Sequence, residues 1–597
     1  MNRPRTSHCV LTVVLGIAIP AACLASCSDD RGGFATTDQT FEPDASVDAP
    51  DCRLQCSLDG RAVIEACSGQ VVETCPEHLA CGGAKCIDPC AAAAEDRSSN
   101  GCDFYFQSPQ FSKNFFPSCH AAFIVNTSNQ PVGVSLELAG KSLDITSSLY
   151  RTTPGSAALV PHTGPIPAGE SVVLFLSDAD PQMPRDPQWY PEYAKCPDGI
   201  VPTTLAKGFT GGTVVGSSYR VRTNVPVALT SMYPFGGAAS FLPTATLVFP
   251  VASWAKDHVV VNGWGQPLSF GKPGVQIVAS EDDTEVTIVP KVDIENGVGV
   301  KGGRAGRPWK YMLGQGQYLQ LAQEQELTGS FVTSNKPTTT FGGHGCSYIG
   351  SGGPCDILGQ QIPAFERWGS EYVGVGYRPR LGNEAEPMFY RIVAARDGTM
   401  LEYDPEIPPG APTTLNAGEV ARFKSGTGDA FVVRTQDTEH PIYVAAHMTS
   451  ANGDPSVGIP ATGKKGDPEF VNVVPAGQYL NAYSFYADPT YADTSLVVVR
   501  AKLRDEFKDV WLECAGNLTE WKPVGTGGNF EYTRVDLARA GSREVTYGTS
   551  VCRNGLQRMK SDGPFTATLW GWDTHASYAY PGGMAQRKLV EQGLDVR

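Results

Sequence analysis

Short apolar runs, separated by Gly, Pro and acidic residues, recur along most of this chain with a period of about 112 residues. One landmark of the repeat is a proline followed by an aromatic residue and a β-branched or aromatic run. Its copies are Pro250 with Trp254, Pro363 with Trp368, and Pro475 with Tyr479. The prolines are 113 and 112 residues apart. This spacing predicts duplicated units of domain size.

A second landmark is an apolar run, an acidic turn and another apolar run. The turns contain Asp283, Asp397 and Asp509, which are 114 and 112 residues apart. Asp and Gly turns between apolar runs are typical of β-hairpins, so each pair of runs is predicted to form one. The expected equivalent strand pairs are residues 276–288, 391–403 and 496–512.

Two further landmarks complete the repeat. A strand is predicted to end in a polar turn with proline and to be followed by another strand, because proline suits the first residue of a strand. A glycine-centred turn leads into a further strand in each copy. The prolines are Pro226, Pro337, Pro441 and Pro564, and the glycines are Gly169, Gly316, Gly418 and Gly528.

These patterns predict an all-β protein of tandem β-sandwich-like repeats, since almost no stretch has a helical period. The alternative is a closed, β-propeller-like ring, in which each copy would contain two or more unlike blades. The predicted divisions are a signal peptide (1–26), a flexible acidic linker (27–50), a Cys-rich module (51–102) and β repeats at 103–236, 237–346, 347–460 and 461–597.

The N-terminus has the features of an export signal. Arg3 and Arg5 precede an apolar stretch from Val10 to Leu24 that is too short to remain as a spanning helix. The stretch ends in Leu-Ala-Ser-Cys, which resembles a bacterial lipobox and implies that Cys27 carries acyl chains. The alternative is an ordinary signal peptide cut nearby. Ser28 resembles the residue that follows the acylated cysteine in lipoproteins of the Gram-negative outer membrane.

The remaining cysteines predict disulfides. Eight of them crowd into 51 residues, a density that outside the cytosol indicates a disulfide framework. Zinc is the weaker alternative, because the spacings are not paired knuckles. Cys196 has no obvious partner nearby in the sequence. The disulfide candidates are Cys52, Cys56, Cys67, Cys75, Cys81, Cys86, Cys90, Cys102, Cys119, Cys346, Cys355, Cys514 and Cys552.

Composition narrows the function. The chain has 597 residues and a net charge of −15, which argues against nucleic acid as a ligand, since phosphate binding requires clustered Lys and Arg. No zinc-protease, serine-hydrolase or Walker motif is present, so no catalytic residue is nominated. His344 and His447 follow equivalent strands and could share a metal with Asp356, or simply be satisfied by backbone carbonyls.

Two other groups of residues could have either a ligand-binding role or a purely structural one. The acidic turns at 281–283 and Asp397 could hold Ca²⁺, although turn chemistry explains them without a metal, so no cofactor is assigned. The aromatic residues Trp254, Trp368 and Tyr479 could stack on a sugar, but one per repeat at one position favours core packing.

Several segments carry a resemblance to a known family. They are residues 119–127, 335–346, 355–363 and 467–475, which include Asn335-Lys336-Pro337 and Gly342-Gly343-His344-Gly345-Cys346. They are similar to the IgGFc-binding protein N-terminal domain family, in its bacterial lipoprotein form, over roughly residue 101 to the C-terminus. The resemblance implies a surface-exposed, non-catalytic binding or adhesive role. It brings no Fc-contacting residues with it.

The sequence therefore predicts an outer-membrane lipoprotein that is anchored by lipid and binds an unknown protein or glycan. Two alternatives stay open. One is an exported hydrolase acting on glycans or envelope polymer, for which no pair of carboxylates is evident. The other is a purely structural envelope protein.

Overall fold

The computed structural model describes residues 53–594, apart from 58–59, 113–114, 154–155, 184–193, 209–210, 241, 267, 269–270 and 351–353. Strands dominate this part of the chain, which holds one α-helix, α1 (Pro89–Asp96), and five short 3-10 helices. The 3-10 helices are η1 (Gly237–Ser240), η2 (Val251–Ser253), η3 (Phe365–Arg367), η4 (Pro455–Val457) and η5 (Ala476–Gln478). The prediction of an all-β protein is confirmed.

Four repeats follow the Cys-rich module, and each is a two-layer β-sandwich with seven strand positions, which we letter A to G in chain order. One layer has the strand order A–F–C–D, and the other has the order E–B–F–G. The third repeat shows this most simply, because its layers are two separate four-stranded sheets. In the other repeats strand F joins the two layers into one curled sheet.

The strands at positions A to G have the following bounds. In the first repeat they are β6 (Gly101–Phe106), β7 (His120–Asn126), β8 (Val134–Leu138), β9 (Lys141–Leu143), β12 (Ser171–Ala179), β15 (Tyr219–Tyr233) and β16 (Thr244–Leu247). In the second they are β17 (Ala255–Val259), β18 (Pro273–Ala279), β19 (Thr284–Val289), β20 (Trp309–Leu313), β21 (Gln317–Ala322), β22 (Phe331–Ser347) and β23 (Asp356–Ile362).

In the third repeat strand F is divided in two. The strands are β24 (Glu371–Gly374), β25 (Pro387–Ala394), β26 (Thr399–Asp404), β27 (Thr414–Leu415), β28 (Val420–Gly426), β29 (Phe431–Thr435) with β30 (Ile442–Met448), and β31 (Glu469–Asn472). In the fourth they are β32 (Leu480–Ala487), β33 (Asp493–Ala501), β34 (Val510–Leu512), β35 (Gly516–Asn517), β37 (Phe530–Ala538), β40 (Gly555–Asp573) and β41 (Ala576–Pro581).

Additional strands extend these sheets or, as β38 (Glu544–Tyr547) and β39 (Ser550–Arg553) do, form a separate two-stranded sheet. In the first repeat they are β10 (Leu149–Thr152), β11 (Leu159–Pro161) and β13 (Thr204–Ala206). The next strand, β14 (Val214–Ser217), pairs with β21 and so joins the sheet of the second repeat. In the fourth repeat they are β36 (Lys522–Val524) and the hairpin of β38 and β39.

The prolines that recur once per repeat were predicted to lie in turns. In three repeats they lie inside strand F instead. Strand β22 pairs with β19 as far as Ser334 and with β18 from Thr338, so Pro337 lies where the strand passes from one layer to the other. Pro226 and Pro564 occupy the same gap in β15 and β40. A missing backbone N–H removes no ladder bond at that place. Only in the third repeat does the strand break before Pro441, as predicted.

The predicted hairpins around the acidic turns are wrong. Strands β18 and β19 flank Asp283, but each pairs with β22 and belongs to a different layer. The same holds for β25 and β26 in the third repeat and for β33 and β34 in the fourth. The acidic turn reverses the chain, as its residues predict. The two strands that flank it, however, both pair with the central strand F and not with each other. The turn is therefore an arch between layers.

The recurring aromatic residues occupy equivalent, buried positions. Each follows a one-turn 3-10 helix, and Trp254, Trp368 and Tyr479 are 6%, 1% and 1% exposed. Both indoles donate to the carbonyl oxygen five residues earlier, Trp254 to Phe249 at 3.3 Å and Trp368 to Pro363 at 3.0 Å. The predicted core role of these rings is confirmed.

The repeat boundaries that follow from strand pairing lie further along the chain than the boundaries predicted from the sequence. Strand G hydrogen-bonds to strand F of the same repeat, as β16 does to β15 and β31 to β30. The divisions after residues 236, 346 and 460 would assign these G strands to the following repeat. The pairing places the limits at Pro250, Pro363 and Pro475, just before each 3-10 helix.

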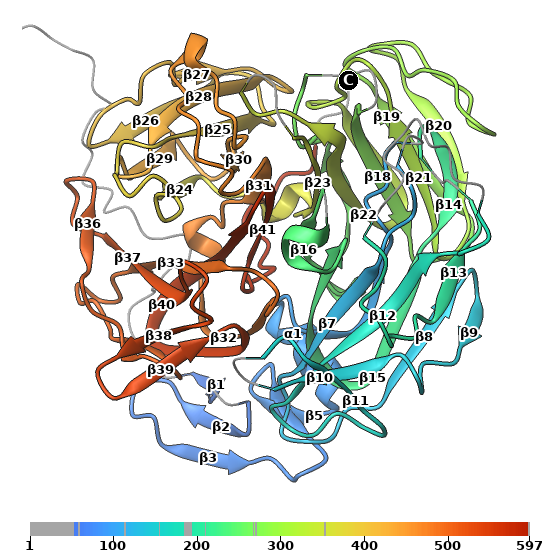
Figure 1. Cartoon of the computed structure of the whole chain (residues 1–597). Coiled ribbons are helices and arrows are strands. Elements are labelled where there is room, and N and C mark those ends of the chain that lie inside the picture. Colours follow the sequence, from blue (N-terminus) through green and yellow to red (C-terminus); the bar gives the residue numbers. More distant parts are fainter. Residues whose placement is uncertain are drawn as a thin grey trace, which may run out of the picture. The chain divides into compact units, whose positions relative to one another are not determined.

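The four sandwiches also pack on one another in a closed ring (Figure 1). The four G strands contact each other in sequence, β16 to β23, β23 to β31, β31 to β41 and β41 back to β16. The end of strand A, or the loop after it, packs on the next repeat. Gln107 Nε2 donates to Gln276 Oε1 at 2.6 Å, and the ring of Tyr486 lies 4.7 Å from that of Phe123, which joins the fourth repeat to the first. Sandwich repeats and a ring were alternatives in the sequence, and the structure combines them.

The Cys-rich module contains little secondary structure besides α1. Its strands are β1 (Leu54–Cys56), β2 (Ala62–Glu65), β3 (Val71–Thr74), β4 (Ala80–Gly82) and β5 (Lys85–Ile87). Disulfides join Cys56 to Cys81, Cys75 to Cys86, and Cys90 to Cys102, and Cys67 is also disulfide-bonded. A module this small has too little apolar core without such bonds. Cys52 lies outside the described residues.

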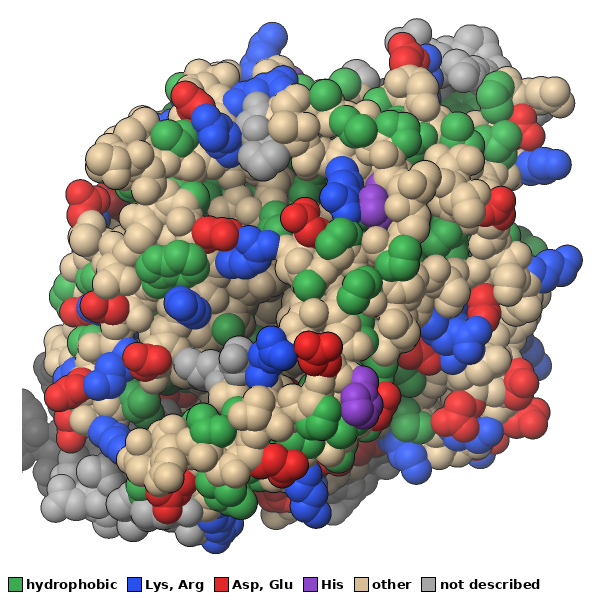
Figure 2. All heavy atoms as spheres, turned by 90° about the horizontal axis from the view of Figure 1, so that it is seen from below, with side chains coloured by type: hydrophobic (Ala, Val, Ile, Leu, Met, Phe, Trp, Pro, Cys, Tyr) green, Lys and Arg blue, Asp and Glu red, His purple; other side chains and the backbone are tan. Residues whose placement is uncertain are grey.

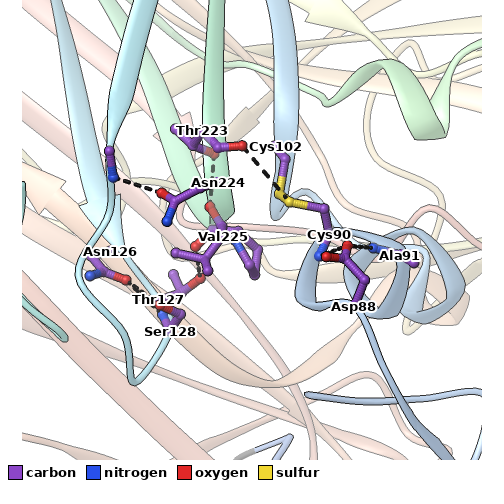
Figure 3. The surroundings of a disulfide bond; sticks show 12 residues. Asp88, Cys90, Ala91, Cys102, Asn126, Thr127, Ser128, Thr223, Asn224 and Val225 are labelled. Carbon is purple, nitrogen blue, oxygen red and sulfur yellow. Dashed lines mark hydrogen bonds between the residues drawn. A yellow bond between two sulfur atoms is a disulfide. The ribbon is translucent and has the colours of Figure 1, made fainter. Parts of the chain in front are cut away.

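One of these disulfides ties the module to the first repeat (Figure 3). Cys90 lies in the first turn of α1, where Asp88 accepts hydrogen bonds from the N–H groups of Cys90 and Ala91 and caps the helix. Its partner, Cys102, lies in strand β6. The sulfur of Cys90 is 3.9 Å from the carbonyl oxygen of Thr223, next to the segment where β15 changes layers.

Three more disulfides lie in the repeats. Cys346 pairs with Cys355, and Cys514 pairs with Cys552. Cys196, for which the sequence offered no neighbour, pairs with Cys119 across 77 residues. The sandwich brings this pair together, because Cys119 immediately precedes strand B and Cys196 follows strand E, which pairs with B. Spacing along the chain could not show that.

The segment after β41 crosses the end of the ring that carries η2, η3 and η5. Met584 accepts a hydrogen bond from Ser99 N at 2.8 Å, and Ala585 N donates to Gln478 O at 2.9 Å. Leu589 N donates to Glu366 O at 2.8 Å, and Val590 is 1% exposed. This C-terminal segment therefore touches the entrance to the first repeat, the fourth repeat and the third.

Candidate functional site

Three buried carboxyl groups lie where the inner G strands begin. Asp356 is the first residue of β23, Glu469 is the first of β31, and Asp467 lies two residues before it. Glu469 Oε1 accepts a hydrogen bond from Thr244 of β16 at 3.1 Å, and the Asp467 N–H donates to Ser577 of β41 at 2.8 Å. This carboxyl cluster therefore connects all four repeats at the centre of the ring.

Burial governs the protonation of the cluster. Removal from water raises the pKa of Asp467 to about 7 and raises those of Asp356 and Glu469 well above their usual values. The charges of Asp467 and Glu469 raise the pKa of Asp356 further. Asp467 Oδ1 accepts a hydrogen bond from Ala451 N at 3.2 Å, which opposes the effect of burial there. Near neutral pH the cluster therefore retains protons.

We expect Asp467→Asn to weaken the loss of stability that the protein shows as pH rises. A carboxyl group whose folded-state pKa is raised stabilises the fold fully below its unfolded value and loses that contribution as pH rises through the folded value, here from about 4 to about 7. Three pH units correspond to roughly 4 kcal/mol at most. Asparagine can still accept from Ala451 N but does not ionise.

The measurement is the melting temperature of the wild type and of Asp467→Asn at pH 5, 7 and 9. The melting temperature of the wild type should fall more steeply than that of the variant between pH 5 and pH 9. Asp397→Asn, at an exposed turn, is the matched control and should follow the wild type. Parallel curves for the wild type and Asp467→Asn would contradict the assignment.

The two histidines proposed as metal ligands are bound by backbone groups. His344 Nε2 donates to Gln266 O at 2.9 Å, and His447 Nε2 donates to Gly263 O at 3.0 Å. Both are fully buried, and burial lowers their pKa values to about 4 and about 3. Both carbonyl acceptors lie in the loop after β17, and the histidines lie within β22 and β30, whereas the sequence placed them after these strands. Both are neutral side chains that donate to a carbonyl oxygen; His344 Nδ1 also accepts from Cys346 N at 3.1 Å, and His447 Nδ1 is buried without a partner.

The acidic turns use their carboxylates locally. Asp282 Oδ1 accepts from Gln315 N at 2.9 Å, and Asp397 Oδ1 accepts from Ala417 N at 3.0 Å. Asp283 has a φ of 53°, in the left-handed region that Asp tolerates in turns. Within the described ranges, no set of three or more His, Cys, Asp or Glu side chains is placed to hold a metal ion.

A large groove lies between the third and fourth repeats. Its main part has a volume of about 1040 Å³, and a side pocket of about 250 Å³ adjoins it through shared residues Glu384, Lys522 and Tyr532. Four prolines from three separate segments line the groove, and their rings fix the backbone there. These are Pro387, Pro409, Pro455 and Pro460.

Charged residues line the groove and its side pocket and join the two repeats. Arg534 of β37 donates to Gly376 O at 3.0 Å and to both oxygens of Glu384, the shorter contact being 2.7 Å. Lys522 Nζ lies 3.3 Å from Glu384. Partial burial raises the pKa of Glu384, but the hydrogen bonds and charges of Arg534 and Lys522 outweigh this and lower it. Glu384 therefore stays ionised and holds the groove in shape.

The surface offers no competing charged patch on the face that Figure 2 shows. Basic and acidic side chains are interspersed over it, with hydrophobic side chains scattered singly between them. Such a mixture is the ordinary surface of a water-exposed protein.

Sequence reasoning missed the groove, because its residues come from six separated stretches of the chain. No motif or periodic pattern links Pro409 to Lys522. The one available signal was the insertion between strands F and G of the third repeat, residues 449–468, which is rich in Gly and Pro and supplies one wall.

Cys27, the predicted lipidation site, lies outside the described residues. Among the residues that the structure places, no helix has both the length and the apolar character needed to cross a bilayer. The disulfide candidates from Cys56 onward are all in disulfide bonds.

Comparison with known proteins assigns the family. Residues 244–571 match the family model described as IgGFc binding protein, which is a description of a binding protein and not of an enzyme. No curated protein matches the chain. The match begins at strand G of the first repeat and ends near the end of strand F of the fourth, and so contains the whole groove. Since it covers more than half of the 597 residues, the protein belongs to the IgGFc binding protein family.

Proposed function

We propose that this protein is a non-catalytic binding protein, anchored by lipid to the outer membrane and exposed at the cell surface. The observation that carries the proposal is the groove between the third and fourth repeats, which lies inside the residues matched to a binding-type family. The ligand is an extended segment of a protein or glycan. The proposal includes no cofactor, and the net charge of −15 argues against nucleic acid.

The shape of the groove supports an extended ligand. The main groove and its side pocket are continuous, and their proline-rich wall needs no ordering when a ligand binds. The lining presents both signs of charge, from Lys522 and Glu384, so it can accept a polar chain of mixed character. These are features of a recognition surface.

Two observations support the location. The Leu24-Ala25-Ser26-Cys27 sequence ends an apolar export signal, and the polar spacer up to residue 50 would separate the anchor from the folded repeats. The many disulfides of the repeats and the Cys-rich module are stable in an oxidising compartment outside the cytosol.

The binding role is tested on a glycan array and an array of secreted and cell-surface proteins that includes the Fc part of immunoglobulin G. We expect a ligand whose affinity falls at least tenfold in Lys522→Glu, because the change places a third acidic group beside Glu384 and Glu520. Lys310→Glu, equally exposed in the second repeat, is the control and should bind as the wild type. Absence of any ligand, or release of sugar from a polysaccharide, would overturn the proposal.

The anchor is tested separately. Cys27→Ser should abolish incorporation of labelled palmitate and move the protein out of the membrane fraction, because the acylated thiol is lost. Membrane fractionation with a palmitate label measures both effects. Retention of label and membrane association in the variant would refute lipidation at Cys27 and would leave the binding role untouched.

A further inference from the structure

A second pocket lies at the junction where the fourth repeat meets the first. Its volume is about 390 Å³, within the roughly 300–1,000 Å³ range of small-ligand sites. Strands β10 and β12 of the first repeat form one side, and β39 and β40 of the fourth form the other. It shares no residue with the groove between the third and fourth repeats.

Three arginines line this junction pocket on a protein of net negative charge. Two are held by carboxylates: Arg558 Nη1 lies 2.8 Å from Glu513, and Arg553 Nη2 lies 2.7 Å from Glu544. Glu170 and Glu513 are the acidic residues of the lining.

Arg151 is the exception. No carboxylate of the described chain forms an ion pair with it, and its Nε–H is buried without a hydrogen-bond partner. A buried donor without an acceptor is costly, since it has lost water and gained nothing in exchange. Its planar guanidinium is suited to a carboxylate, which can accept two parallel hydrogen bonds from it.

The second unpartnered group is Asn554, which is 7% exposed and lines the same pocket. Its Nδ2 donates to Tyr491 O at 3.3 Å, which fixes the orientation of the amide. The carbonyl oxygen, Oδ1, is buried and accepts no hydrogen bond. A ligand that reaches this oxygen must supply a donor to it. A carboxylate alone has none, whereas a hydroxyl group supplies one.

We propose that the junction pocket binds a carboxylated sugar residue, of the uronic acid type. Arg151 would bind the sugar carboxylate, and Asn554 Oδ1 would accept a hydrogen bond from a ring hydroxyl. A neutral sugar leaves Arg151 unpaired, and an acidic peptide can donate to Asn554 only from its backbone N–H groups, because its carboxylate side chains are acceptors alone. The pocket lies at a different junction from the groove, so this site extends the proposed binding role and can be tested apart from it.

The probes are trigalacturonic acid, its fully methyl-esterified form and hexaglutamate, each titrated calorimetrically into the folded chain from residue 28 onward. We expect the acid to bind at least tenfold more tightly than the ester or the peptide. Arg151→Gln should reduce affinity for the acid at least tenfold, and Arg151→Lys should restore part of it by returning the charge without the planar fork. Asn554→Asp should also weaken binding, through repulsion of the sugar carboxylate.

The control is Arg222→Gln, which removes a guanidinium of the first repeat that pairs with Glu137 away from the pocket. It should bind trigalacturonic acid as the wild type does, and so should the groove variant Lys522→Glu. Equal binding of the ester or of hexaglutamate, unchanged binding by a folded Arg151→Gln, or no binding of the acid would each overturn the proposal. Loss of trigalacturonic acid binding in Lys522→Glu, with Arg151→Gln unaffected, would place the ligand in the groove and would also overturn the proposal.

Discussion

Replacing Trp368 by alanine is expected to destabilise the third repeat by about 3–5 kcal/mol, as truncation of large core side chains does. Trp368 is 1% exposed, its ring lies 5.5 Å from that of Tyr443, and its indole donates to Pro363 O. The variant therefore creates a cavity and also leaves a buried carbonyl without its donor. Each repeat of the ring packs on its two neighbours. We therefore expect the loss of stability to be greatest in the third repeat and in the repeats that contact it.

Calorimetry and guanidinium unfolding measure this effect. We expect an early transition, separate from that of the remaining repeats. Trp309→Ala is the control, since Trp309 is only half-buried, at the start of β20 with Lys301 near its ring, and it should cost less than about 1.5 kcal/mol. Equal costs for the two variants would contradict the structural role of Trp368.

Removing the disulfide between Cys119 and Cys196 is the second large expected effect. The bond closes a segment of 77 residues, and the loss of chain-entropy restraint in the unfolded state corresponds to about 4 kcal/mol. The double variant Cys119→Ser with Cys196→Ser should therefore lower the free energy of unfolding by about that amount. Unfolding in guanidinium without reductant provides the measurement.

The bond between Cys346 and Cys355 is the matched comparison, because it spans only nine residues. Its removal should cost about 2–3 kcal/mol by the same relation. An equal or larger cost for the short loop would show that native packing, and not chain entropy, dominates the effect of these disulfides.

Much of the repeat could be predicted from sequence because its signals are local. The spacing of Pro250, Pro363 and Pro475 reports the period, and the rings that follow them are buried as their phase predicted. The structural role of the buried histidines could also be predicted, since a lone imidazole on an apolar strand usually forms a hydrogen bond with a carbonyl oxygen. These features depend on neighbours within a few residues.

Pairing was less accessible, since it depends on partners far along the chain. The turn at Asp283 has hairpin chemistry, yet its flanking strands separate into two layers because β22 runs through both. In the same way, Cys119 and Cys196 meet only because strands B and E pair. Turn residues determine that the chain reverses and leave open which strand it then joins.

By itself, the sequence determined the all-β class, the period of the repeats and the presence of many disulfides, because each is encoded in composition or spacing. Tertiary structure alone decided that four sandwiches close into a ring, that Asp356, Asp467 and Glu469 meet at its centre, and that the groove and the junction pocket lie between repeats. The physical reason is that these sites consist of contacts between segments more than 100 residues apart, which only the packing of one repeat on the next brings together.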